Sequence, residues 1–384
     1  MDRVIEVGKE NLSYLLESYD PTLASEAMKW YEGANKIAYR LAQVIRPGLS
    51  DKHLNRDQAA GIIARLSPQK EWNQNIALAF RLVEIYKHFQ SNPDAVFTEE
   101  MFQWWTKDTL AINKKTYEDS LEEIRKREYL SPGQRSTQIN QAQSLLRDNL
   151  NEKEALVAQD GVKARFTSIF TGDKVEIKAI YEGTFVPKSW MEMTGVSGVA
   201  EKARMIRAYE ETQYEDRLEL QNPVLKGQVL PKGSRQYAVY RPDGTTDGTV
   251  ALNEVNRKPA ALGWNDYPDI ESALSILMDG SALNISEQLG MGHKVRSFFN
   301  NINAPNDERS VTIDTHAIAA FYFSPYGGSA REVSDTMSGV QNEALGYTGM
   351  NPMIAEAYFQ LAEELGVSPR ALQSVTWEAM RSLI

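Results

Sequence analysis

Apolar residues recur with the spacing of one helix face near both ends of this chain. The clearest examples are Ala59, Ile62, Ile63 and Leu66 in the first block, and Ile270, Ala273, Leu274 and Leu277 in the second. This spacing predicts amphipathic helices, each with an apolar face that another element must cover. Because neither block has enough apolar surface for a core alone, we expect residues 30–90 and 263–325 to pack together.

The middle of the chain has a different pattern. In the stretch KVEIKAIYEG, the residues Val175, Ile177 and Ala179 alternate with polar ones, which predicts a β-strand. Two short apolar runs flank Asp-Gly pairs that begin at Asp243 and Asp247, and this arrangement predicts a hairpin.

These patterns predict a mainly α-helical chain in three parts. Residues 1–90 form an N-terminal helical part, and residues 263–384 form a C-terminal helical part. Residues 91–262 form a large mixed α+β insertion between them.

The composition excludes several kinds of site. The chain has no cysteine, so it has no disulfide, no thiolate zinc site and no cysteine nucleophile. Its four histidines are scattered and do not suggest a metal cage. We therefore expect neither a metal ion nor a cofactor.

Charge and hydropathy limit the partners. The formal net charge is −10. A protein that binds nucleic acid through a broad basic surface has the opposite sign, so DNA binding would need a local site. No apolar run has the form of a signal peptide or approaches the roughly 18 residues of a membrane helix. We expect a cytoplasmic protein without a membrane partner.

The segment LNISEQLGMGHKVRSFFNNI, residues 283–302, has two short helical stretches on either side of Gly290 and Gly292. Paired glycines permit a tight turn and a close approach of another backbone. The amides that begin the second helix could then hold a phosphate. An ordinary helix-turn-helix corner explains the same pattern.

Asp314 stands in VTIDTHAIAAFYF, after a short apolar run and before a helical stretch. Aspartate is a good helix N-cap, so a capping role explains this residue when it is taken alone. Lys294 follows the glycine pair, and taken alone it is an ordinary surface lysine.

Together the two segments resemble the helix-hairpin-helix DNA glycosylase superfamily, which has the HhH-GPD fold. Its endonuclease III branch has a Leu-Pro-Gly-Val-Gly-Arg-Lys hairpin followed by Val-Asp-Thr-His. Here the matching elements are Leu289-Gly290-Met291-Gly292-His293-Lys294 and Asp314-Thr315-His316, with Gln288 where proline is usual. The resemblance implies that Lys294 is a nucleophile and that Asp314 is the essential carboxylate.

A third similarity lies upstream. Leu66-Ser67-Pro68-Gln69, with the later Asn75, resembles a Leu-Ser-Ala-Gln element and its trailing asparagine in the same branch. The resemblance implies that Gln69 reaches into the duplex where the base is removed. Without cysteine, this chain lacks the iron–sulfur cluster that the family often carries. The C-terminal ALQSVTWEAMRSL is similar to that of uncharacterised phage-encoded proteins, so we expect a divergent phage-type member in the host cytoplasm.

The implied function is a DNA-base-processing enzyme that flips a modified base out of double-stranded DNA and acts at its glycosidic bond. Lys294 and Asp314 would be catalytic. The positive end of the helix dipole would favour the neutral amine of Lys294, and Asp314 would stabilise positive charge on the sugar. Contacts to DNA would come from Gln69, Gly290, Gly292, His293 and His316.

Two alternatives stay open. Phage transferases that install amino acids or polyamines on modified thymine also resemble this superfamily, and they displace pyrophosphate from the base. The fold alone does not separate the two reactions. A non-enzymatic phage DNA-binding or structural protein could have the same core. The sequence does not indicate the oligomeric state or the function of the insertion.

Overall fold

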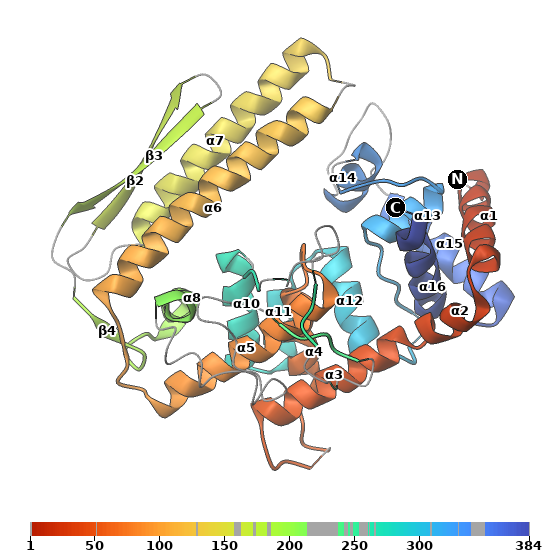
Figure 1. Ribbon diagram of the computed structural model, residues 1–384, viewed down its shortest axis with the longest axis horizontal. Helices are drawn as coiled ribbons and strands as arrows, with labels where there is room; N and C mark the ends of the chain where they lie inside the picture. The colour runs from red at the N-terminus through yellow and green to blue at the C-terminus, as the bar shows by residue number, and fades with distance from the viewer. Residues whose placement is uncertain are drawn as a thin grey trace. The chain divides into compact units, whose positions relative to one another are not determined.

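The computed structural model describes most of the chain and is mainly helical (Figure 1). This confirms the predicted fold class at that level. The described residues are 2–50, 52–127, 130–156, 163–171, 174–182, 186–212, 237–241, 245, 249–252, 260, 262–264, 266–307, 309–328, 330–338 and 350–383. The chain forms two compact units, of which the first is Met1–Tyr86 with Leu220–Ile384 and the second is Lys87–Glu219.

The first unit joins helices that are far apart in the sequence. Its N-terminal helices are α1 (Asp2–Ser18), α2 (Pro21–Ala27), α3 (Trp30–Ile45), α4 (Arg56–Arg65) and the beginning of α5 (Trp72–Ser91). Its C-terminal helices are α10 (Tyr267–Met278), α11 (Ala282–Leu289), α12 (His293–Asn303), α13 (Thr315–Tyr322), α14 (Arg331–Ser338), α15 (Met350–Leu365) and α16 (Pro369–Leu383).

Helix α4 connects the two groups, because it packs against α3 from the first and against α10, α11 and α12 from the second. Every residue from Gln58 to Ala64 is buried. The side-chain amide of Gln58 donates hydrogen bonds to the carbonyls of Ile276 and Leu277, both at 2.9 Å. These carbonyls are among the last four of α10, which have no partner inside their own helix, so Gln58 satisfies groups that burial would leave unpaired.

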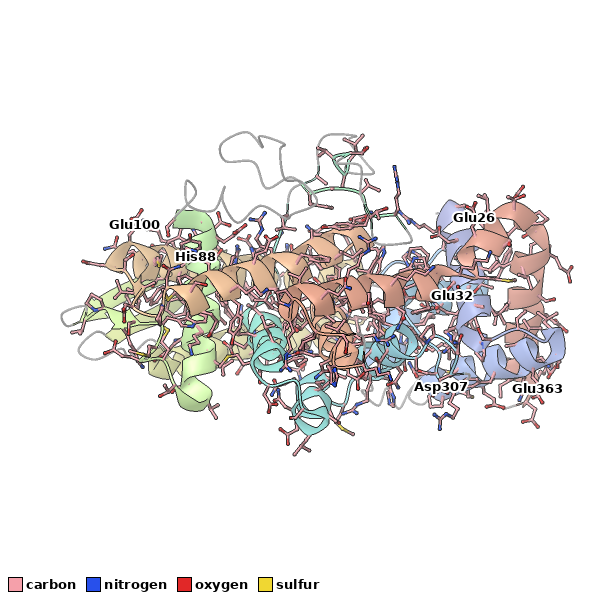
Figure 2. All side chains as sticks on the ribbon, turned by 90° about the horizontal axis from the view of Figure 1, so that it is seen from below. Glu26, Glu32, His88, Glu100, Asp307 and Glu363 are labelled. Atoms are coloured by element: carbon pink, nitrogen blue, oxygen red, sulfur yellow. The ribbon has the colours of Figure 1, made fainter. Side chains whose placement is uncertain are left out.

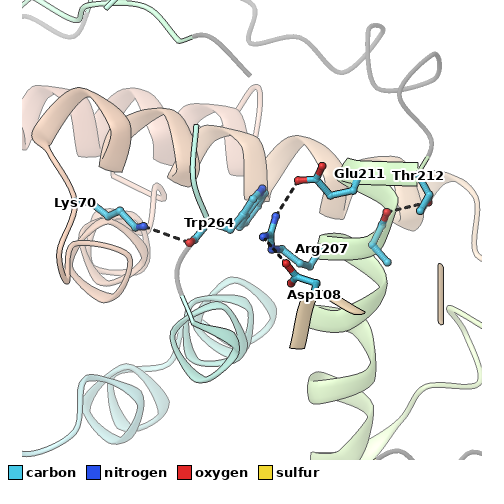
Figure 3. Close-up of polar contacts among 7 residues, drawn as sticks. Lys70, Asp108, Arg207, Glu211, Thr212 and Trp264 are labelled. Atoms are coloured by element: carbon cyan, nitrogen blue, oxygen red, sulfur yellow. Dashed lines mark hydrogen bonds and ion pairs between the residues drawn. The ribbon is translucent and has the colours of Figure 1, made fainter. Parts of the chain in front are cut away.

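The segments that precede α5 and α10 are also joined. The ammonium of Lys70 donates a hydrogen bond to the carbonyl of Trp264 at 3.2 Å (Figure 3). Nearby, Ala238 and Val250 form an antiparallel bridge, which confirms the pairing of the predicted hairpin. The Asp-Gly pairs that begin at Asp243 and Asp247 lie outside the described residues.

Besides the packing around α4, the first unit has a hydrophobic core among α1, α13, α15 and α16. Phe321 on α13 and Tyr358 on α15 are buried in it. Helix α1 approaches α13 closely at Gly8, where an added Cβ would lie 2.0 Å from Cε2 of Phe321. This close approach requires glycine, since any side chain at residue 8 would overlap the ring.

The second unit contains α6 (Glu99–Lys126), α7 (Pro132–Leu156) and α8 (Gly195–Thr212). Strands β2 (Lys163–Thr171) and β3 (Lys174–Glu182) form an antiparallel hairpin in which Lys163 lies opposite Glu182 and Thr171 opposite Lys174. The pairing confirms the predicted strand in KVEIKAIYEG, and the hairpin packs against α6 and α7. The short strands β1 (Val96–Phe97) and β4 (Lys188–Ser189) pair antiparallel as well.

Charged side chains hold α8 to α6 within the second unit. The guanidinium of Arg207 forms ion pairs with Asp108 at 3.4 Å and with Glu211 at 3.1 Å (Figure 3). It also lies over the ring of Trp104, 5.2 Å from the ring centre. Arg207 is buried, and a buried charge needs such partners to offset its lost hydration.

Replacing Gly8 by alanine tests the packing of α1 on α13. Helix propensity alone favours alanine by about 1 kcal/mol, but overpacking a core costs about 1–3 kcal/mol. Because the new Cβ would overlap the ring of Phe321, we expect Gly8→Ala to lower the free energy of unfolding in a denaturant titration. Gly133→Ala on α7 is the control, since a Cβ there meets nothing within 4 Å. A Gly8→Ala variant more stable than the wild type would contradict this packing.

Candidate functional site

The glycine pair forms an exposed turn between two helices of the first unit. Helix α11 ends at Gly290, whose φ of 68° is a left-handed value that favours glycine. Gly292 is the N-cap of α12 and provides no side chain to cap it. The first amides of α12 therefore stay open to a ligand. Met291, between the two glycines, is 88% exposed.

Arg296 holds this turn closed. Its Nε donates to the carbonyl of Gly290 at 2.8 Å, and its Nη2 donates to the carbonyl of Ser286 at 2.8 Å. Its Nη1 donates to the hydroxyl of Ser286 at 3.2 Å. The sequence pattern did not single out Arg296, although a basic residue one helical turn after the second glycine is the signal that could have found it.

Lys294 and His293 lie at the beginning of α12, beside the open amides. Lys294 is half-buried and His293 is exposed. Neither side chain forms a hydrogen bond or an ion pair with any residue that the structure describes. Within the part of the chain that the structure describes, the amine of Lys294 therefore makes no polar contact that stabilises the fold.

Gln69 occupies a tight turn between α4 and α5. The amide of Lys70 donates to the carbonyl of Ser67 at 3.1 Å, with Pro68 and Gln69 in the two central positions. Gln69 has a φ of 56°, which glycine or asparagine normally adopts at the third position of such a turn. Its side chain is exposed and has no hydrogen bond among the described residues. A strain of about 1–3 kcal/mol is thus held at a residue whose side chain forms no hydrogen bond with the described residues.

The turn leads into α5, where Glu71 caps the helix by accepting hydrogen bonds from the amides of Asn73 at 3.1 Å and Gln74 at 3.2 Å. Asn75 follows and is buried. Neither polar atom of its side-chain amide has a hydrogen-bond partner in the described part of the chain. Leaving such a group unpaired costs about 1–3 kcal/mol.

Both carboxylate oxygens of Asp314 accept hydrogen bonds. Oδ1 accepts from the amide of Ala317 at 2.9 Å, so Asp314 does cap α13. Oδ2 accepts from the indole Nε1 of Trp377 on α16 at 3.0 Å. The ring of His316 lies 5.0 Å from the ring of Trp377. Asp314 is half-buried, and capping is not its only contact.

An aromatic cluster made of Trp30, Tyr31, Trp72 and Phe298 connects these elements. The ring of Trp30 lies 4.8 Å from Tyr31, 4.7 Å from Trp72 and 6.1 Å from Phe298. The cluster therefore joins α3, α5 and α12 inside the first unit.

Gln69 and Lys294 are close in sequence to members of this cluster, and the charge of Asp314 influences a third member, Tyr31. Trp72 comes three residues after Gln69, and Phe298 lies one helical turn after Lys294 on the same face of α12. Burial raises the pKa of Tyr31 to about 12, and the negative charge of Asp314 adds to the rise. No hydrogen bond or ion pair links Gln69, Lys294 and Asp314 to one another in the described residues, so their joint role in catalysis stays a prediction.

One known protein family matches this chain. A family model described as a family of unknown function, DUF7178, matches residues 9–131 and 268–383, which is more than half of the chain. The chain belongs to this family. The matched segments of the DUF7178 chain include Gln69, Lys294, Asp314 and Trp377, and they leave residues 132–267 unmatched. No curated protein and no solved structure matches the chain.

Among the described residues, no helix is long and apolar enough to cross a membrane. No group of three or more histidine, aspartate or glutamate side chains in the same residues is placed to hold a metal ion.

Replacing Gln69 by glycine separates stability from binding. Glycine adopts a positive φ without strain, so we expect the free energy of unfolding to stay the same or rise by about 1 kcal/mol. The affinity for a duplex that contains one abasic site should fall about fivefold to tenfold, because one contact is lost. Phe323→Gly is the control, since Phe323 has the other positive φ of a described non-glycine residue, 47°. A Gln69→Gly variant that binds as the wild type does would contradict a DNA contact.

Proposed function

We propose that this chain processes a base in double-stranded DNA and acts at its glycosidic bond with Lys294 and Asp314. The observation that supports this most is that the segments with Gln69, Lys294 and Asp314 belong to one compact unit, in which the aromatic cluster joins α3, α5 and α12. These are the residues that the resemblance to the helix-hairpin-helix glycosylases assigns to the duplex, the nucleophile and the carboxylate.

The proposed contact with DNA is local. Exposed acidic residues such as Glu26 on α2, Glu32 on α3 and Glu363 on α15 give parts of the first unit a negative surface (Figure 2). The turn at Gly290 and Gly292 instead offers open backbone amides at the positive end of α12, which suit a phosphate without a broad basic patch. His293 extends from the same end and His316 lies near Asp314, so both are proposed to contact the DNA backbone.

The chemistry that we propose needs a base taken out of the helical stack, because its glycosidic bond is not accessible in a closed duplex. The neutral amine of Lys294 attacks C1′ of the sugar, and the bond from C1′ to the base breaks. The base leaves with the electron pair and takes up an amine proton. The nitrogen lone pair then expels O4′, which takes a proton from water and leaves hydroxide, so the ring opens to an iminium between Lys294 and C1′. Asp314 stabilises the positive charge on the sugar as it develops.

An abasic duplex tests this proposal without knowledge of the base. Its sugar aldehyde can condense with a lysine amine, and borohydride reduces the iminium to a stable protein–DNA adduct. We expect the wild type to form this adduct and Lys294→Ala to form none. Asp314→Asn should keep its affinity for DNA but form the adduct about a hundredfold more slowly.

Lys36→Ala is the matched control for Lys294→Ala, because Lys36 is an exposed lysine on α3 and should leave adduct formation unchanged. An adduct that persists in Lys294→Ala would contradict the proposed nucleophile. Release of pyrophosphate from a pyrophosphorylated base, with the base retained in the DNA, would favour the transferase alternative. A wild type that shows no adduct and no transfer would favour the non-enzymatic alternative.

A further inference from the structure

Helix α16 is buried, yet many of its buried side chains are polar. They are Arg370, Gln373, Ser374 and Thr376. A helix that only filled a core would have apolar residues at these positions, since a buried polar group must find a partner to offset its lost hydration. The hydrogen-bond partners of these buried side chains therefore indicate which residues α16 contacts through its polar groups.

Two of these side chains, Gln373 and Thr376, bond to buried tyrosines whose pKa is influenced by the charge of Asp314. Gln373 accepts a hydrogen bond from the hydroxyl of Tyr31 at 3.2 Å. Burial raises the pKa of Tyr31, and the negative charge of Asp314 raises it further. The hydroxyls of Thr376 and Tyr358 lie 3.0 Å apart. Burial is the main cause that raises the pKa of Tyr358, and the negative charge of Asp314 is a smaller one. Gln373 and Thr376 of α16 thus bond to the two tyrosines whose pKa the negative charge of Asp314 helps to raise.

Trp377 makes the direct contact. Its indole Nε1 donates to Oδ2 of Asp314 at 3.0 Å. Its ring is held by the ring of His316, with centroids 5.0 Å apart, and by the guanidinium of Arg381, 5.3 Å from the ring centre. These two contacts restrict the rotation of the indole, so its N–H stays directed at the carboxylate.

We infer that Trp377 is a positioning residue that fixes the carboxylate of Asp314 for its reaction. The inference rests on the proposed function. Asp314 is held by two donors from different helices, the amide of Ala317 on α13 and the indole of Trp377 on α16. Together they fix the plane of the carboxylate and still leave acceptor capacity on each oxygen, since a carboxylate has about four lone-pair positions.

A residue that only orients the carboxylate of Asp314 should change the rate of the reaction and not the affinity for DNA. The indole touches neither the open amides of α12 nor Gln69 through any hydrogen bond in the described residues. Its loss should therefore leave the affinity for DNA unchanged. The carboxylate would lose its fixed orientation, and small misplacements of a reacting group can slow a reaction by about a hundredfold.

The test compares Trp377→Phe with the wild type on an abasic duplex. Phenylalanine keeps an aromatic ring but has no N–H. At saturating DNA we expect the rate of adduct formation to fall about tenfold to a hundredfold, while the dissociation constant changes by less than about twofold. Trp264→Phe is the matched control, because Trp264 is buried in the same unit and its indole N–H has no partner among the described residues. Its rate should equal that of the wild type.

A nuclear magnetic resonance measurement tests the bond itself, without any reaction. In protein with ¹⁵N-labelled tryptophan, the indole signal that disappears in Trp377→Phe belongs to Trp377. Asp314→Ala should move the proton of this signal upfield and leave the Trp264 signal in place. An unmoved Trp377 signal would overturn the inference, because the bond would then be absent.

The kinetic outcomes separate this inference from the proposed function. If Asp314→Asn is slow but Trp377→Phe reacts as fast as the wild type, the positioning role is overturned and the proposed function stands. If Asp314→Asn is as fast as the wild type, or the wild type forms no adduct, both are overturned. A slow Trp377→Phe with unchanged DNA affinity and an unchanged free energy of unfolding supports the positioning role.

Discussion

The burial of α4 is the constraint on which the candidate site depends. Helix α4 is covered by α3 on one part of its surface and by α10, α11 and α12 on others, so two segments separated by a long stretch of sequence must pack together. Gln58 strengthens this arrangement by satisfying two end carbonyls of α10. Since α12 carries Lys294 and the turn after α4 carries Gln69, the same packing sets where both residues lie.

Two costly features follow α4 within one short segment. Gln69 has a strained backbone with an exposed side chain, and Asn75 has a buried amide with no partner among the described residues. Neither feature stabilises the fold, and each costs about 1–3 kcal/mol. Selection for stability alone would favour glycine at residue 69 and an apolar side chain at residue 75. Such costs are typical of sites where a protein gives up stability for function.

The sequence predicted the features that depend on neighbouring residues. The turn at Gly290 and Gly292, the position of Asp314 before α13 and the alternating strand β3 all follow from local chemistry. The bond between Asp314 and Trp377 could not be predicted, because the two residues lie on different helices and only the tertiary packing brings them together. The C-terminal stretch that contains Trp377 did carry a resemblance, but nothing in its spacing indicated a partner.

The positive φ of Gln69 could not be predicted from the sequence either. Pro68 predicted a break after α4, but the sequence did not determine which turn would form there. The hydrogen bonds of Arg296 were also not predicted. Its partners are two backbone carbonyls and one hydroxyl, which become its neighbours only when α11 folds back on α12. The missing information was the type of turn for Gln69 and the relative placement of α11 and α12 for Arg296.

Hydrogen–deuterium exchange of the full chain, with and without a duplex that contains one abasic site, tests the central claim most directly. The proposed function requires three separate segments to form one DNA-binding site. DNA should therefore slow amide exchange in residues 68–74, 290–296 and 314–318 together, with no comparable change in α7 or α15. Protection that is confined to other parts of the chain, or that appears in only one of the three segments, would contradict a single site built around the aromatic cluster.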